Sequence, residues 1–321
     1  MPYYGPLEDS YILFQEKGFL AADFVSGVGY GIQLALYIKC VVHLWNRRKS
    51  RGNGSLFLLG YITVLLSLYL LFLASGARTT EDMYINNRNY PGGPWAYFLA
   101  TQNLPENVLF IVSLFLLTFL SDLLVLWRCW VIWNSSGNVA AYAATAIPAT
   151  ALLTSFALGI MWIWVSSQKG FSVFDSFPLA IGTAYCVTSF IANSLLTILI
   201  IFRLVLHRRR ILAILPSEHA AHYVSLAIII TESAALYSIF ALAYIVTYAI
   251  DSPINLILLP MLTSSQQISS YLIILRLVRE RAWSLDALTS AAGSESRLTT
   301  LQFKASSLSP DDLAIDKDEV I

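Results

Sequence analysis

The stretch Asp122-Leu-Leu-Val-Leu-Trp-Arg-Cys-Trp-Val-Ile-Trp133 closes an apolar run that begins near Asn107. This run of about 27 residues would form roughly 40 Å of helix, enough to cross a bilayer with some tilt. It nevertheless contains an acid, Asp122, near mid-depth and a guanidinium, Arg128, near one end. Burying an ionised group in hydrocarbon costs at least about 2.5–3.5 kcal/mol, so such groups face protein or water and usually pair. The stretch therefore predicts a membrane helix whose polar residues are shielded inside a bundle.

The composition of the whole chain also indicates a membrane protein. Of its 321 residues, 57% are hydrophobic and only 12% are charged, whereas soluble domains contain about 25% charged residues. The net charge is zero, so no overall field attracts nucleic acid and we expect no nucleic-acid partner. The three cysteines, Cys40, Cys129 and Cys186, lie in apolar runs, which argues against an extracellular disulfide framework.

Seven apolar runs predict seven helices, at about 19–45, 56–75, 107–133, 139–165, 178–206, 223–250 and 254–278. A spanning segment must be a helix or part of a closed barrel, and runs of this length without period-2 alternation favour helix. We therefore predict an all-α fold, a polytopic bundle of seven transmembrane helices over residues 19–283. Residues 1–18 would be an extracellular N-terminus, and 284–321 a disordered cytosolic tail. The lipid bilayer is the first expected partner.

Basic residues predict the orientation of the bundle. One side of the predicted membrane carries Arg47, Arg48, Lys49, Arg51, Arg208, Arg209, Arg210, Arg276, Arg279 and Arg281. The other side carries only Lys17, Arg78, Arg88 and Lys169. Since cytosolic loops are enriched in Lys and Arg, the N-terminus is predicted outside and the C-terminus in the cytosol. We expect the plasma membrane in preference to an internal membrane.

Polar residues on the last three predicted helices indicate a cavity inside the bundle. The amides and hydroxyls of 263–270 would lie at mid-membrane, where they need other helices or water as partners. On the sixth helix, Glu232 shares an inward face with tyrosines. The candidate ligand-lining residues are Thr183, Cys186, Asn193, Tyr237, Tyr244, Tyr248, Gln266 and Gln267. For Asn193 the sequence favours bonding to another helix, with ligand contact as the alternative.

The first helix is expected to pack closely on a neighbour, and the segment 76–106 allows two interpretations. Gly27, Gly29 and Gly31 adjoin a polar stripe on the first helix, which favours close helix packing, and Asp23 lies near the outer boundary where water can hydrate it. In 76–106, the aromatic residues after Pro94 form either a lid over the bundle or an anchor at the lipid interface.

Four motifs together resemble a known family. They are Asp122 with Trp127-Arg-Cys-Trp-Val-Ile-Trp133, then His207-Arg-Arg-Arg-Ile211, then Thr231-Glu-Ser-Ala-Ala-Leu-Tyr-Ser238, then Gln267 with Leu272-Ile-Ile-Leu-Arg276 and Arg281-Ala-Trp283. The combination is similar to that of the seven-helix membrane proteins of mushroom-forming fungi. The resemblance extends over nearly the whole chain up to the tail. It implies a receptor-like topology and, since the family is mostly without assigned activity, little about function.

The favoured functional hypothesis is a receptor-like sensor of a small, mostly apolar organic ligand. Arg128 and Glu232 differ in depth by about four residues, or near 6 Å of rise, so they can approach each other. With Asp122 they would form a polar switch between the third and sixth helices. The basic loop between the fifth and sixth helices and the start of the tail would offer a surface to a cytosolic signalling partner.

Two alternatives remain. One is a transporter or lipid-handling protein, favoured by Pro148, Pro260 and the polar seventh helix. The other is a membrane scaffold without signalling, in which the buried charges only fix packing. We expect no enzyme: all four histidines lie at the predicted cytosolic boundary, and we identify no catalytic, cofactor or metal site.

Overall fold

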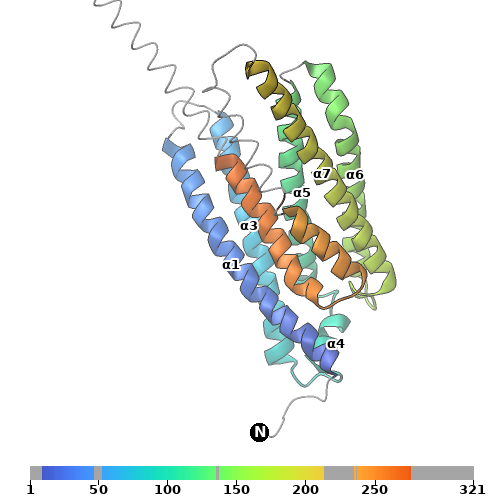
Figure 1. Cartoon of the computed structure of the whole chain (residues 1–321). Helices are drawn as coiled ribbons and strands as arrows, with labels where there is room; N and C mark the ends of the chain where they lie inside the picture. Colours follow the sequence, from blue (N-terminus) through green and yellow to red (C-terminus); the bar gives the residue numbers. More distant parts are fainter. Residues whose placement is uncertain (1–8, 47–52, 135–136, 213–234, 236, 276–321) are drawn as a thin grey trace, which may run out of the picture. The chain divides into compact units, whose positions relative to one another are not determined.

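A computed structural model describes residues 9–46, 53–134, 137–212, 235 and 237–275, and no strand occurs within these ranges (Figure 1). The helices are α1 (Ser10–Asn46), α3 (Asn53–Glu81), the π-helical turn η1 (Asp82–Asn86), α4 (Gly93–Ala100), α5 (Pro105–Asn134), α6 (Asn138–Ser166), α7 (Ser176–Leu212), Tyr237–Ala249 and 254–275. The chain divides into two units, Met1–Ile274 and Leu275–Ile321, and all contacts below lie in the first.

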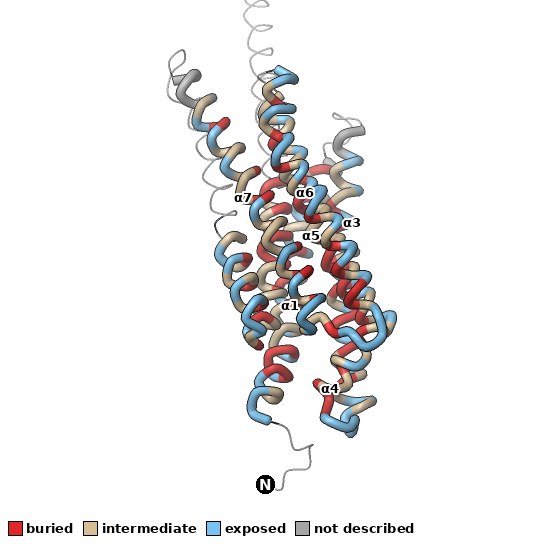
Figure 2. Tube along the Cα trace, turned by 90° about the vertical axis from the view of Figure 1, so that its right-hand side faces the viewer, coloured by how far each residue is buried: buried red, intermediate tan, exposed pale blue. Residues whose placement is uncertain are grey.

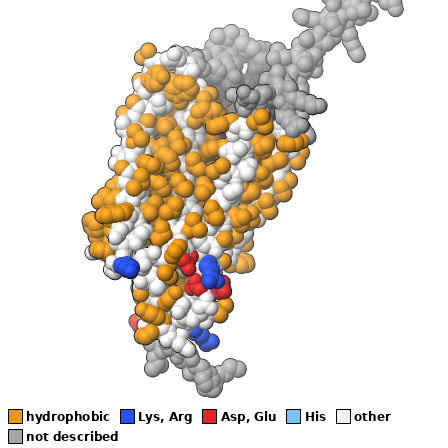
Figure 3. Space-filling model, turned by 180° about the vertical axis from the view of Figure 1, so that it is seen from behind, with side chains coloured by type: hydrophobic (Ala, Val, Ile, Leu, Met, Phe, Trp, Pro, Cys, Tyr) orange, Lys and Arg blue, Asp and Glu red, His pale blue; other side chains and the backbone are white. Residues whose placement is uncertain are grey.

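Within the residues that the structure describes, five helices are long and apolar enough to cross a membrane. They are Ser10–Trp45, Leu56–Asn86, Pro105–Asn134, Asn138–Ser166 and Ser176–Leu206. Large apolar side chains on them face outward; Phe24 is 75% exposed and Phe57 74%. Figure 3 shows hydrophobic side chains over most of one face, and the charged side chains of the described residues on that face lie toward one end. The chain is therefore a multi-pass membrane protein with an all-helical fold.

The observed helix boundaries differ from the predicted ones at several points. Helix α1 begins at Ser10 rather than near residue 19. At its start the Asp9 carboxylate accepts the Ser10 N–H (2.8 Å), and the Asp9 carbonyl accepts the Leu13 N–H (3.1 Å). Helix α3 continues to Glu81 rather than ending near residue 75. Of the predicted sixth helix, 223–250, only Ala235 and residues 237–250 are described, and the helix there ends at Ala249. The predicted tail lies outside the described residues.

Packing follows chain order along the bundle. Contacts join α1 to α3, α3 to α5, α5 to α6, and α7 to both α5 and α6. Figure 2 shows buried residues recurring along the helices, interleaved with exposed ones, as expected when one face of each helix packs inward.

The 254–275 helix packs against three of these helices. The Tyr271 hydroxyl donates to the Ile62 carbonyl of α3 (2.9 Å), and the hydroxyls of Ser264 and Tyr69 are 2.8 Å apart. Gln267 donates to Ser121 Oγ of α5 (2.9 Å). On its α1 side, the Cys40 thiol lies 3.9 Å from the Tyr271 carbonyl. This polar helix is therefore an inner element of the bundle.

One glycine allows α1 to approach the 254–275 helix. A Cβ at Gly29 would lie 2.1 Å from Ser264 Oγ and 2.9 Å from the Tyr69 hydroxyl, so a larger residue does not fit without a shift. A Cβ at Gly27 or Gly31 would have nothing within 4 Å. Close packing was expected for the whole glycine string, but it applies to Gly29 alone.

The aromatic residues of α4 point into the bundle. Trp95 and Phe98 are buried with Phe19 and Met83 in one hydrophobic cluster. The ring centroid of Phe19 lies 6.4 Å from that of Trp95 and 5.1 Å from that of Phe98. The Trp95 N–H also donates to Glu16 Oε1 of α1 (3.2 Å). These contacts place the two α4 rings as a cover over one end of α1, rather than at the lipid interface.

Candidate functional site

Asp122 of α5 is the centre of a buried polar network. Its carboxylate accepts hydrogen bonds from Ser189 Oγ (2.8 Å) and Asn193 Nδ2 (2.5 Å) of α7, and from Gln266 Nε2 of the 254–275 helix (2.8 Å). Asp122 is 1% exposed, and Ser189, Asn193 and Gln266 are buried too. Within the described ranges no basic side chain forms an ion pair with Asp122. One carboxylate therefore links three helices.

The local sequence explains why these donors converge. Ser189 and Asn193 are four residues apart on α7, so they project from one face onto the same carboxylate. Each hydrogen bond to a charged group contributes about 1.5–3 kcal/mol, which offsets part of the cost of burying an acid. An ionised carboxylate is an acceptor only, and all three partners donate to it. The network is thus complementary in its donors and acceptors.

A second layer lies next to this network. Gln267 Nε2 donates to Ser121 Oγ and to the Leu117 carbonyl (3.2 Å), so adjacent glutamines of the 254–275 helix bind two neighbouring positions of α5. On the α3 side, the Tyr61 hydroxyl donates to the Leu120 carbonyl (2.7 Å). These bonds fix the rotation of α5 about its axis, and so the direction in which Asp122 points.

Arg128 joins α5 to the last described turn of the 254–275 helix. Its Nη2 donates to the Ile273 carbonyl (2.7 Å). Glu232, the predicted partner of Arg128, lies outside the described residues, so that pairing stays a prediction. A further arginine, Arg203 of α7, is 6% exposed and lies over the Trp133 ring at 5.6 Å from its centroid. The α5–α7 contact at this end thus contains a cation–π interaction.

Three cavities follow one another inside the bundle. The aromatic cavity lies at the α4 end and is lined by rings such as those of Phe19, Phe110 and Tyr244. The centres of water-sized molecules can occupy about 80 Å³ of it. The middle cavity, beside Cys186, has about 40 Å³. The arginine cavity, beside Arg128, has about 60 Å³. A buried water needs about 10–15 Å³ by this measure, so each cavity has room for several waters or a small ligand.

Shared side chains separate successive cavities. Tyr244 lines both the aromatic and the middle cavity, and Gln266 and Tyr237 line both the middle and the arginine cavity. The partners of Asp122 lie at the second division, since Ser189 lines the middle cavity and Asn193 the arginine cavity. The carboxylate network therefore forms a partition in the interior of the bundle.

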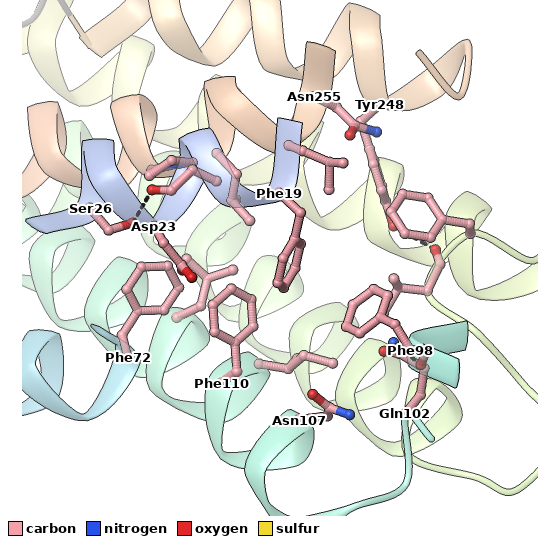
Figure 4. A pocket seen from close by; sticks show the side chains of 18 of the residues that line it. Phe19, Asp23, Ser26, Phe72, Phe98, Gln102, Asn107, Phe110, Tyr248 and Asn255 are labelled. Atoms are coloured by element: carbon pink, nitrogen blue, oxygen red, sulfur yellow. Dashed lines mark hydrogen bonds between the residues drawn. The ribbon is translucent and has the colours of Figure 1, made fainter. Parts of the chain in front are cut away.

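The aromatic cavity is formed by several elements (Figure 4). Phe19 and Asp23 come from α1, Phe72 from α3, Phe110 from α5 and Asn255 from the 254–275 helix. The rings of Phe72 and Phe110 stack at 4.6 Å between centroids. An interior that is mostly apolar with a few polar groups is typical of a site for a small organic molecule.

Six of the eight predicted lining residues border these cavities: Cys186, Asn193, Tyr237, Tyr244, Tyr248 and Gln266. The other two are used in packing. Thr183 bonds the Leu179 carbonyl of its own helix (2.8 Å), and Gln267 bonds α5.

Sequence reasoning missed the contribution of α1 and of Ser189. Asp23 was expected to be hydrated at the boundary, yet it lines the aromatic cavity. The sequence contained a signal for this position, since Asp23 and Ser26 share one polar face of the helix. The structure places both residues at the aromatic cavity. Ser189 had a comparable signal, since it is one helical turn from Asn193 on the same face of α7.

No protein-family model, curated protein or solved structure matches this chain.

Proposed function

We propose that this protein is a receptor-like membrane sensor that binds a small, mostly apolar organic ligand in the aromatic cavity. In this proposal seven helices span the plasma membrane, with the N-terminus outside, so the aromatic cavity opens toward the outer half. The resemblance to the seven-helix proteins of mushroom-forming fungi is consistent with that arrangement. The protein has no catalytic role in this proposal.

The observation that supports the proposal is a series of shared lining side chains that connects the aromatic cavity to the Asp122 network. Tyr244 borders the aromatic and middle cavities, and its ring stacks on that of Tyr248 at 5.5 Å. Gln266, at the far side of the middle cavity, donates to Asp122. A ligand that contacts Tyr244 in one conformation more favourably than in another would shift the population of the bundle. The hydrogen bonds of Asp122 are the linkage that would transmit the shift.

The response would appear at the other end of the bundle. There Arg128 holds the Ile273 carbonyl, and we propose that Glu232 pairs with Arg128 in the resting state. Release of these contacts would open the cytosolic ends of α5 and the helix containing Tyr237, near the basic loop that offers a partner surface.

The test combines binding with a conformational readout. Purified protein in lipid is screened with small aromatic molecules by thermal shift, and amide exchange is followed in residues 270–275. A ligand should raise the unfolding temperature and speed exchange there. Tyr244→Ala should abolish both effects. Leu242→Ala, at a position 56% exposed on the same helix, is the matched control and should keep both. Stabilisation without faster exchange would refute signalling.

The polar switch has its own test in a cell-based coupling assay. Arg128→Gln and Glu232→Gln should each raise basal coupling if the two side chains hold the resting state together. In a double-mutant cycle, contact predicts a double mutant that differs from the sum of the single mutants by about 0.5 kcal/mol or more. Additive effects would show that the two residues act separately.

The stacked cavities also favour a second candidate, transport. Three successive cavities divided only by side chains would suit a pathway that opens one partition at a time. Uptake of a bound ligand into proteoliposomes, abolished by Tyr244→Trp, would favour transport over sensing.

A further inference from the structure

The aromatic cavity has an acceptor at one end. Asp23 Oδ2 accepts the Thr80 hydroxyl, whereas Oδ1 has no hydrogen-bond partner within the described part of the chain. Oδ1 lies beside Gly76 and Phe110: a Cβ at Gly76 would be 3.2 Å from Oδ1 and 3.5 Å from Phe110 Cε2. A carboxylate oxygen among aromatic rings is therefore available to a donor inside the cavity.

The other end of the cavity offers a donor. Asn255 Nδ2 is buried, in a residue 3% exposed, and it has no hydrogen-bond partner in the described residues. The nearby Trp162 Nε1 is different, because it interacts with the Tyr248 hydroxyl, which itself donates to the Val173 carbonyl (3.0 Å). A buried donor without an acceptor is destabilising, so a ligand acceptor at this end would be favoured. Figure 4 shows Asp23 and Asn255 well apart across the cavity, with Phe19 between them in that view.

The charge of the lining distinguishes between ligand classes. Among the described residues that line the cavity, Asp23 is the only charged one, and none is Lys, Arg or His. An anionic ligand would meet an uncompensated negative charge, whereas an ammonium would pair with Oδ1. Phe72 and Phe110, which line the same cavity, would pack against the apolar body of such a ligand.

From these contacts we propose that the ligand of the aromatic cavity is a small protonated amine with an aromatic or alkyl body and a hydrogen-bond acceptor at its far end. The ammonium binds Asp23, the body packs among the rings, and the acceptor receives the N–H of Asn255 Nδ2. This inference rests on the proposed function, since it names the ligand class of the same site.

The experiment uses a matched series of probes on the full chain in lipid nanodiscs. Phenethylamine, phenethyl alcohol and phenylacetate share one ring and differ in the terminal group. Phenethylamine should bind at least about tenfold more tightly than the alcohol, and phenylacetate should not bind. Tyramine, which adds a phenolic oxygen at the far end, should bind about tenfold more tightly than phenethylamine, since one added hydrogen bond of about 1.4 kcal/mol changes affinity tenfold.

Two variants test the two ends of the aromatic cavity separately. Asp23→Asn keeps an acceptor for Thr80 but removes the charge, and should abolish the preference for amine over alcohol. Asn255→Leu should abolish the tyramine gain, so that tyramine binds no more tightly than phenethylamine. Asp251→Asn is the matched control for Asp23→Asn, because Asp251 does not line the cavity, and it should change neither preference.

The outcomes separate this inference from the proposed function. Equal binding of amine and alcohol by the unmodified protein, or an amine preference that persists in Asp23→Asn, overturns the inference, even if a neutral ligand still triggers faster exchange in 270–275. Binding of none of the four probes also overturns it. Amine binding that requires Asp23 but produces no faster exchange supports the inference and contradicts sensing.

Discussion

Asp122 shows how one side chain specifies the interior of this bundle. An acid at mid-depth in a spanning helix is expensive, and here two side chains of α7 and one of the 254–275 helix donate to it. Removing the acid leaves those donors unpaired, and removing one donor leaves part of a buried charge unpaired. The effect of a substitution at this position on stability should therefore depend more on hydrogen-bond complementarity than on the hydrophobicity of the new side chain.

The first residue-level prediction compares Asn, Leu and Lys at position 122. Asp122→Asn keeps an oxygen for Asn193 and Gln266, so it should lower stability by less than about 2 kcal/mol. Asp122→Leu is more apolar, but it strands two buried amides at about 1–3 kcal/mol each, so it should destabilise more. Asp122→Lys should not yield folded protein. Thermal unfolding and expression at the cell surface measure these effects.

The control is Ser113→Ala, because the Ser113 hydroxyl bonds only carbonyls of its own helix and its loss should change stability little. If Asp122→Leu lowered stability less than Asp122→Asn, the carboxylate would not be held by these donors.

At the level of elements, the 254–275 helix is the most informative. It combines buried Thr, Ser and Gln side chains with contacts to α1, α3 and α5. Helices in a membrane associate through close packing and interhelical hydrogen bonds, since lipid provides little hydrophobic drive between them. The polar run at 263–267 is thus explained by its position inside the bundle. Its approach to α1 depends on the absence of a side chain at Gly29.

A second prediction follows for the three glycines of α1. Gly29→Ala should lower stability by about 1–3 kcal/mol, because the added methyl must displace Ser264 and disturb its contact with Tyr69. Gly27→Ala and Gly31→Ala should be neutral or stabilise by up to about 1 kcal/mol through helix propensity. Thermal unfolding of the three variants in one lipid provides the comparison. Equal effects at all three positions would contradict the close approach at Gly29.

At the level of the whole molecule, the lipid-facing surface and the interior have different chemistry. Exposed side chains such as Phe24, Phe57 and Trp164 suit hydrocarbon, whereas the interior contains hydrogen-bonded polar groups and cavities. The five long apolar helices define a multi-pass protein, and the basic residues predict its orientation.

The third prediction tests that orientation by labelling cysteines with a membrane-impermeant maleimide on intact cells. Asn89→Cys, between η1 and α4, should be labelled from outside. Asn138→Cys, at the start of α6, should react only after permeabilisation. Both positions are exposed, and the unmodified protein is the control, because Cys40 and Cys129 are fully buried and Cys186 is half-buried. The reverse labelling pattern would place the N-terminus in the cytosol.

Much of the candidate site was predictable because depth along a helix can be counted from the sequence. Asp122, Asn193 and Gln266 were each expected inside the bundle, and each is buried there. Their mutual contact was not predicted, since the hypothesis joined Asp122 to Arg128 and Glu232. Counting residues gives the height of a side chain but not the rotation of its helix about its own axis.

By itself, the sequence determined that the chain crosses a membrane repeatedly as helices and that its polar residues turn inward. Backbone groups and charges in hydrocarbon leave no other favourable arrangement. Only the tertiary structure decided which side chains meet: Asp122 with Ser189, Asn193 and Gln266, and Asp23 with the aromatic cavity. The physical reason is that partner choice depends on helix rotation and approach, which close contacts such as that at Gly29 set across distant parts of the chain.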